Sequence, residues 1–206
     1  MPVEGCPCCV SDEEVAQLHA QPMEKLGEKI LDRFIWSATL TWGDLNDLKH
    51  FLPRILELAL DGQFDLWILA QRLESTKWRE WPEVEISALE DAFELAWQIA
   101  LKSENSGLLQ EWLELYAALQ EPISRRLLSW MNSENPQLRC EFAAWIASGQ
   151  WQNQQLPNIN ELFTSQFTDA LETQFFESTD PSCADTFSQA VDLVRSLAVW
   201  KSRNEN

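Results

Sequence analysis

The chain has 206 residues, 45% hydrophobic and 23% charged, a balance typical of a soluble globular protein that buries its core without disulfides. Its 33 acidic residues outnumber 15 basic ones, and the formal net charge of −18 disfavours binding to nucleic acid or to an anionic membrane. The sequence has no run of about 18 apolar residues, so we expect no membrane-spanning helix. Residues 1–14 have neither the basic nor the apolar region of a secretory signal. We therefore expect a cytoplasmic protein whose five cysteines are reduced.

Apolar residues recur at helical spacing along almost the whole chain, and the alternation typical of strands is rare. The first predicted helix begins after Ser11, where the sequence Ser-Asp-Glu-Glu has the pattern of a capping box, and it ends near His19. Pro22 separates it from a second helix, which we expect Gly43 to stop.

Asp44 is the expected N-cap of the next segment. Pro53 is expected to break or kink the chain, because proline disfavours helical geometry in the residue before it, and a helix from Pro53 then ends before Gly62. Another helix covers residues 64–74, and Pro82 opens the clearest one, in which apolar residues follow at spacings of three and four. The remaining predicted helices cover residues 108–119, 122–132, 136–148, 159–176 and 181–201.

These nine or ten helices predict an all-α protein, either an irregular multi-helix bundle or a helical array of the HEAT or TPR kind. The polar, uncharged segment 150–158 is the best candidate for a linker. It would separate a main helical domain, residues 1–150, from a C-terminal helical pair, residues 151–206, that packs on it, although the whole chain is also compatible with a single domain.

Three cysteines lie close to the start of the chain, and Cys6 and Cys9 form a C-x-x-C pair with Cys8 between them. Two thiolates at this spacing can bind one face of a tetrahedral zinc ion. His50 is the first choice for a further ligand, followed by Cys8 or His19, because Cys140 and Cys183 are distant in the sequence. Redox chemistry and simple packing of the thiols remain alternatives.

A second group of polar side chains lies in residues 41–54, and its members are Asp44, Asp47, Lys49, His50 and Arg54, next to Trp42. On a helix, Asp47 and His50 are neighbours at i and i+3, so the carboxylate could orient the imidazole as a general base. The structural alternative is that Asp44 caps the helix, Asp47 favours its N-terminal dipole and His50 packs beside Trp42.

The sequence TWGDLNDLKHFLPRILEL, with the C-x-x-C before it and KWREWPEVE after it, resembles a family of uncharacterised bacterial helical proteins. The resemblance covers about the first hundred residues and implies no activity. It marks as motif positions Cys6, Cys9, Trp42, Gly43, Asp44, Lys49, His50, Pro53 and Arg54.

The chain contains none of the common catalytic motifs, so a non-enzymatic role is favoured. Trp78 and Trp81 flank two charged residues in a predicted loop and are candidates for exposed aromatic contacts. Between Arg139 and Arg195 the chain has acidic residues and no lysine or arginine. We therefore expect a protein-binding module with a basic partner, such as an immunity-type inhibitor of a basic toxin. The alternatives are a small zinc protein and a helical scaffold.

Overall fold

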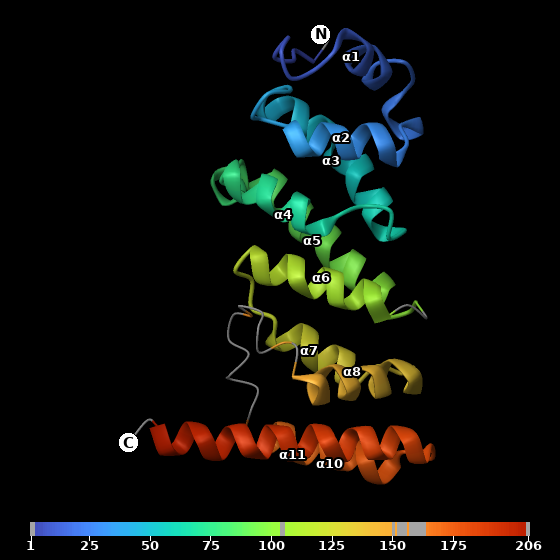
Figure 1. The fold of residues 1–206 in the computed structure, drawn as a ribbon, viewed down its shortest axis with the longest axis vertical. Helices are drawn as coiled ribbons and strands as arrows, with labels where there is room; N and C mark the ends of the chain where they lie inside the picture. Colours follow the sequence, from blue (N-terminus) through green and yellow to red (C-terminus); the bar gives the residue numbers. More distant parts are fainter. Residues whose placement is uncertain (1–2, 104–105, 150, 152–155, 157–163, 205–206) are drawn as a thin grey trace. The chain divides into compact units, whose positions relative to one another are not determined.

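The computed structural model describes residues 3–103, 106–149, 151, 156 and 164–204, and this part of the chain is all-α (Figure 1). It contains ten α-helices, two short 3-10 helices and no β-strand, apart from two isolated bridges. The prediction of an all-α fold with nine or ten helices is therefore confirmed. The chain divides into two compact units, Met1–Ala100 and Leu101–Asn206, which we describe separately.

The N-terminal unit is built from stacked helical pairs. Its α-helices are α1 (Asp12–Leu18), α2 (Glu28–Ser37), α3 (Leu45–Leu60), α4 (Leu66–Ser75) and α5 (Glu83–Ala100), and the 3-10 helices are η1 (Met23–Lys25) and η2 (Trp78–Glu80). Consecutive helices α1 and α2, and α2 and α3, contact one another. In addition, α2 contacts α4 and α3 contacts α5, so alternate helices stack as they do in a helical array.

Helix starts in this unit follow from local side-chain chemistry. Ser11 caps α1 and Asp44 caps α3, each within a complete capping box, and the side chain of Asp65 caps α4. The predicted caps at Ser11 and Asp44 are confirmed. Pro53, in contrast, does not break the chain but lies inside α3, exposed to solvent. The apolar face of α3, which includes the buried Phe51 and Ile55, offsets the cost of about 3 kcal/mol for a proline within a helix.

Helix α2 ends at Ser37, earlier than the predicted stop at Gly43, because a tight turn follows it. The carbonyl of Ser37 accepts from the backbone N–H groups of residues 40, 41 and 42, at 3.1, 3.0 and 3.1 Å. Within the turn, Thr39 has a φ of 63°, a conformation that is costly for a β-branched residue. The turn directs Trp42 back into the core, where its side chain is fully buried.

The C-terminal unit contains α6 (Ser106–Ala118), α7 (Ser124–Met131), α8 (Pro136–Ser148), α10 (Ser165–Glu177) and α11 (Pro181–Asn204). The predicted start of α8 at Pro136 and its C-cap at Gly149, which has a φ of 65°, are confirmed. Helix α11 packs against both α8 and α10. The last two helices therefore belong with α8, and the two compact units divide at residue 100 instead of the expected 150. Most of the expected linker 150–158 lies outside the described residues.

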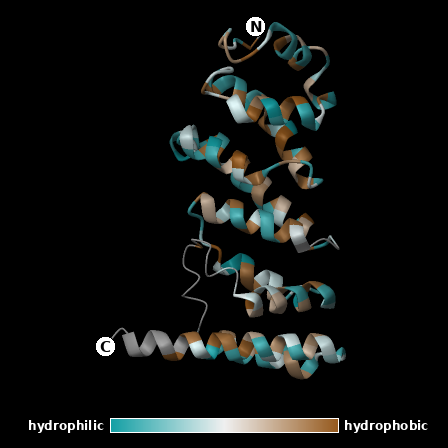
Figure 2. Cartoon of the chain, in the orientation of Figure 1, coloured by the Kyte–Doolittle hydropathy of each residue, from teal (hydrophilic) through white to brown (hydrophobic). Residues whose placement is uncertain are grey.

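Tryptophan dominates the cores of both units. Among the largest fully buried side chains are Trp42, Trp78, Trp97, Trp112 and Trp130. Figure 2 shows hydrophobic and hydrophilic residues alternating around the helices, as expected for helices that bury one face. None of the helices in the described residues combines the length and the apolar character needed to cross a bilayer.

Candidate functional site

The three N-terminal cysteines form one cluster of thiols. The Sγ atoms of Cys6 and Cys8 are 3.0 Å apart, and those of Cys8 and Cys9 are 3.5 Å apart. All three Sγ atoms lie within 4.8 Å of one another, and no disulfide joins them. Cys8 and Cys9 are exposed and Cys6 is half-buried. Cys8 therefore lies with the C-x-x-C pair, and the three thiols form one group.

Backbone hydrogen bonds fix the loop that carries these thiols. The carbonyl of Cys6 accepts from the N–H groups of Cys9 and Val10, both at 2.9 Å, which closes a tight turn. The N–H of Cys6 donates to the carbonyl of Thr41 at 2.7 Å, and the N–H of Gly43 donates to the carbonyl of Glu4, also at 2.7 Å. An isolated antiparallel bridge pairs Gly5 with Trp42. The backbone segments that carry the GCPCC and TWGD motifs are thus joined by hydrogen bonds, although neither is a β-strand.

Arg33 of α2 connects this loop to the helices, and the sequence offered no sign of that role. Its Nη2 donates to the carbonyl of Cys9 at 2.8 Å, and its Nε donates to Glu14 of α1 at 2.8 Å. Its Nη1 donates to Ser37, and its guanidinium lies 5.7 Å from the ring centroid of Trp42. One cationic side chain therefore braces the thiol loop, α1 and the TWGD segment.

The thiols are not equivalent. Hydrogen bonds from the side chain and then the backbone of Cys8 lower the pKa of Cys6, and the backbone of Cys9 contributes to the same effect. Hydrogen bonding to Cys6 and Cys9, followed by their charges, raises the pKa of Cys8 to about 11. Without a bound cation, the first thiolate to form in the cluster is therefore not that of Cys8.

The histidines proposed as metal ligands do not join the thiols. Among the described residues, the group of ligand atoms within 4.8 Å contains the three cysteines alone. His50 is exposed on α3, and its ring stands edge-on to Phe51 with 4.8 Å between centroids. His19 lies at the end of α1, where its Nε2 accepts from the N–H of Val3 at 2.9 Å. The predicted ligand set of Cys6, Cys9 and His50 is therefore not brought together.

The pair of Asp47 and His50 does not form a general base. The carboxylate of Asp47 accepts from the N–H of Asp44 at 2.9 Å, as its part of the capping box. Within the described residues no hydrogen bond joins it to His50. The structural alternative for Asp44 and Asp47, a cap and a residue of the first turn, is thus the arrangement found.

Two further charged residues of this segment serve the fold. Lys49 pairs with Glu85 of α5, and its Nζ lies 4.4 Å from the ring centroid of Trp81. The Nε of Arg54 donates to the carbonyl of Leu26 at 3.0 Å. Both side chains therefore tie α3 to neighbouring segments of the same unit.

The expectation that Trp78 and Trp81 are exposed contacts is wrong. Their exposed fractions are 1% and 7%. The indole N–H of Trp78 donates to Glu74, and that of Trp81 donates to the carbonyl of Thr76, both at 3.2 Å. The short loop that carries them folds as η2 onto the end of α4, so the flanking charged residues point outward while both rings are buried.

An exposed group of acidic and aromatic side chains was missed by the sequence reasoning. Trp36 of α2 is 49% exposed and Trp67 of α4 is 56% exposed, on two helices that contact each other. The carboxylate of Asp32 interacts with the Trp36 side chain and with the charge of Asp65, and Asp65, the N-cap of α4, accepts from the backbone N–H of Trp67 at 2.9 Å. We call these four residues the acidic–aromatic face.

The acidic side chains of this face affect the ionisation of Asp32. Burial, followed by the charges of Asp65 and Glu28, raises the pKa of Asp32. Arg72 of α4 is nearby, and its guanidinium donates to the carbonyls of Ile35 and Trp36, both at 2.8 Å. The arginine thus satisfies two carbonyls at the end of α2, and the charge of Asp65 disfavours ionisation of Asp32.

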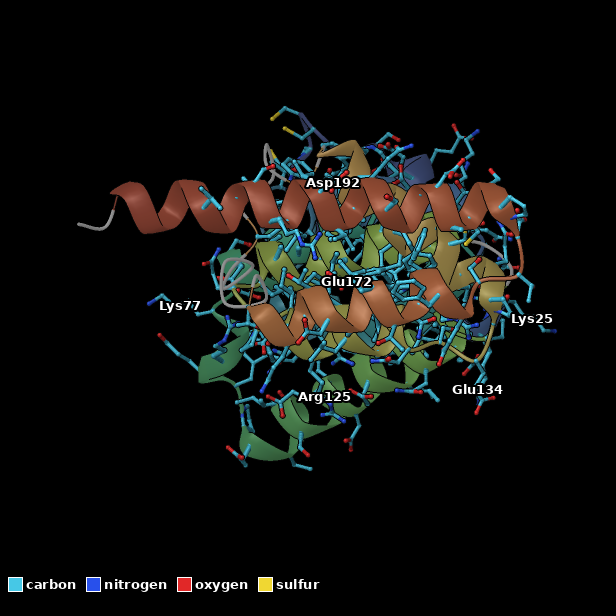
Figure 3. The ribbon with its side chains drawn as sticks, turned by 90° about the horizontal axis from the view of Figure 1, so that it is seen from below. Lys25, Lys77, Arg125, Glu134, Glu172 and Asp192 are labelled. Carbon is cyan, nitrogen blue, oxygen red and sulfur yellow. The ribbon has the colours of Figure 1, made fainter. Side chains whose placement is uncertain are left out.

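In the C-terminal unit, the acidic interval between Arg139 and Arg195 covers most of α8, all of α10 and more than half of α11. Figure 3 shows α10 and α11 side by side, with Glu172 on the first helix and Asp192 on the second. Arg195 pairs with Glu172, so this carboxylate is partly neutralised. The described carboxylates that are exposed in this interval are Asp169, Glu177, Asp180, Asp185 and Asp192.

Two cysteines that are distant in the sequence meet in this unit. Cys140 of α8 and Cys183 of α11 both line a cavity of about 160 Å³ at the ends of α8, α10 and α11. Burial, followed by a hydrogen bond with Cys183, raises the pKa of Cys140 to about 12. The thiol of Cys140 is therefore a poor nucleophile at neutral pH.

Comparison of the chain with protein-family models, with curated proteins and with solved structures finds no match.

Proposed function

We propose that this chain is a non-enzymatic protein-binding module whose partner is basic, and that the partner docks on the acidic–aromatic face of the N-terminal unit. The observation that carries this proposal is the pair of half-exposed indoles, Trp36 and Trp67, beside the carboxylates of Asp32 and Asp65. An immunity-type inhibitor of a basic toxin is one concrete form of such a module.

The two exposed indole rings provide apolar contact area for a partner. Tryptophan is enriched among residues that dominate binding energy, because its large ring can be desolvated while its N–H keeps a polar partner. Trp36 and Trp67 stay half-exposed in a chain whose other tryptophans include several that are fully buried. Two rings left at the surface of contacting helices are therefore suited to a partner.

The two carboxylates of this face favour a positively charged partner. Two acidic groups that repel each other are stabilised by a cation placed between them, and a lysine or arginine can at the same time lie on an indole ring. The formal net charge of −18 would attract such a partner over a longer range and accelerate its association. The exposed acidic residues of α10 and α11 add to this attraction, and the rings beside them are those of Phe175 and Phe176, which lack the polar N–H of an indole.

Affinity capture with matched variants tests the proposal. The immobilised full chain is compared with the double variant Trp36→Ala and Trp67→Ala, using a lysate of the native host. The control is Val84→Ala with Leu95→Ala, since these two α5 residues are 76% and 59% exposed in the same unit. We expect basic proteins that the wild type and the control retain, that the tryptophan variant loses, and that elute as salt rises.

The purified partner then gives a quantitative result. Each tryptophan truncation should weaken binding by about 2 kcal/mol, or about 30-fold, as for a hot-spot residue. Equal retention of every captured protein by the wild type and the tryptophan variant would refute the docking face. Selective loss of acidic proteins only would refute the choice of a basic partner.

A further inference from the structure

We propose that Cys6, Cys8 and Cys9 together form a three-thiolate site for a single zinc ion, with a fourth coordination position open to a small external donor. This inference is independent of the protein-binding function, because the thiol loop and the acidic–aromatic face share no residue. It differs from the ligand set expected from the sequence in that Cys8 replaces His50.

The spacing of the sulfur atoms suits one ion. Three thiolates around a tetrahedral zinc, each about 2.3 Å from the metal, are about 3.8 Å from one another. The observed separations are 3.0 Å between Cys6 and Cys8, 3.5 Å between Cys8 and Cys9, and at most 4.8 Å within the group. Small side-chain rotations that move each sulfur by a few tenths of an ångström therefore bring all three sulfur atoms to the separations that a shared zinc ion requires.

The loop is held in place without the metal. The Cys6 carbonyl accepts two backbone N–H groups, and the Cys6 N–H is bound to Thr41. Because these bonds come from the backbone, the chain need not reorganise when the ion binds, and the ordering cost of the loop has been met by the fold. The thiols of Cys8 and Cys9 are exposed, so the ion can enter from solvent.

The surroundings favour the charge that such a site carries. Three thiolates and Zn²⁺ together have one net negative charge, and Arg33 is fixed by its hydrogen bond to the carbonyl of Cys9. The same guanidinium donates to Glu14 and Ser37, so its position beside the loop does not depend on the ion. A fixed donor next to the ligand residues helps to orient them.

The open position follows from the lack of a fourth donor among the residues that the structure describes. In the described part of the chain, no histidine or carboxylate joins the group of three. A zinc site with three protein ligands keeps its fourth position for water or another external ligand. The exposure of Cys8 and Cys9 leaves that side accessible, so a low-molecular-weight thiol is a suitable fourth donor.

Metal titration of the full chain tests the proposal. The reduced, metal-free protein is titrated with zinc against a chromophoric chelator, and separately with Co²⁺, whose thiolate charge-transfer and d–d bands report sulfur ligands and tetrahedral geometry. We expect one ion per chain. Each of Cys6→Ser, Cys8→Ser and Cys9→Ser should weaken zinc binding at least about 100-fold, more than the loss of a residue that only supports a ligand.

Matched controls separate this site from the alternatives. His50→Ala, Cys140→Ser and Cys183→Ser should leave the zinc affinity unchanged within about twofold, and a small thiol should shift the d–d bands of the Co²⁺ form. Three results would overturn the proposal: zinc binding no tighter than that of the triple Cys→Ser variant, unchanged binding in Cys8→Ser, or loss of binding in His50→Ala. Tight binding of Cu⁺ with no measurable binding of Zn²⁺ would overturn the choice of zinc.

Discussion

Replacing Gly43 by alanine should cost the N-terminal unit about 3 kcal/mol, and three separable effects make up this value. Gly43 has a φ of +70°, and an alanine in this conformation costs about 1 kcal/mol. Its Cβ would lie 2.8 Å from Val3 Cγ1 and 2.9 Å from Asp47 Oδ2. Displacing Asp47 weakens the capping box of α3 by about 1 kcal/mol, and partial exposure of the buried Val3 side chain adds about 1 kcal/mol.

Gly62 provides the matched control for this substitution. Its φ is +68°, almost that of Gly43, but no heavy atom lies within 4 Å of the position that a Cβ would take. Gly62→Ala should therefore show the conformational cost of about 1 kcal/mol alone. Gly27→Ala adds a second control, since its Cβ also meets nothing and its φ is not in the left-handed region. The difference between the first two variants isolates the effect of crowding.

The measurement combines denaturation with hydrogen exchange on the full chain. Urea unfolding followed by far-UV circular dichroism gives the free energies of unfolding, and exchange of the Cys6 and Gly43 amides reports whether the thiol loop stays bound to the TWGD segment. We expect Gly43→Ala to lose protection at Cys6, whereas Gly62→Ala keeps it. Costs of Gly43→Ala and Gly62→Ala that agree within about 0.5 kcal/mol, with protection retained in both, would refute the reasoning.

Three further predictions concern charged side chains of the same unit. The pKa of Asp32 is raised in the folded state, so its ionised form destabilises the fold at a pH above that pKa. Asp32→Asn should therefore raise the melting temperature at pH 7 and weaken the binding of a basic partner, and a lower melting temperature would contradict this. Hydrogen bonds from the backbone and then the side chain of Ser11, together with Arg33, lower the pKa of Glu14 in the folded state. Ionised Glu14 therefore stabilises the fold at a pH above its unfolded-state pKa of about 4.3, and this stabilisation is lost as the pH falls through the lower folded-state pKa. Glu14→Gln should accordingly flatten the fall in stability below about pH 4.5 that wild-type unfolding curves show, and parallel curves would count against the assignment. Arg72→Met removes two hydrogen bonds at the end of α2 and should cost about 2–3 kcal/mol in urea unfolding, where a cost below about 0.5 kcal/mol would be incompatible with the contacts described.

Features that depend on a few neighbouring residues were predictable from the sequence. The capping boxes at Ser11 and Asp44, and the left-handed cap at Gly149, each need only the chemistry of one helix end. Pro53 shows the limit of this reasoning, since its local preference to end a helix is overridden by the buried face of α3. Helix type and most helix ends were therefore accessible, but a local rule failed where packing opposed it.

The candidate sites depended on contacts between distant segments, which the sequence does not reveal. Nothing in the chain marks Arg33 as the residue that binds the carbonyl of Cys9. Cys140 and Cys183 meet because α11 packs on α8, and their separation in the sequence gave no sign of this. Trp78 and Trp81 were misassigned because charged neighbours indicate an exposed loop but do not determine which way a ring points. Only the cysteine cluster was visible from local sequence alone.

The pairing of GCPCC with TWGD has a consequence for the order of events during synthesis. Cys6 leaves the ribosome before Thr41, from which it is separated by about 35 residues, and translation at about 5–20 residues per second makes that interval roughly two to seven seconds. Throughout this time the turn of residues 6–10 has its own two backbone hydrogen bonds but lacks the bonds that join it to Thr41 and Gly43. Those bonds can form only after the TWGD segment has emerged and the Trp42 side chain has been buried. The synthesis of TWGD, and not that of the cysteines, therefore sets the moment at which the thiol turn of the nascent chain is anchored to the helices.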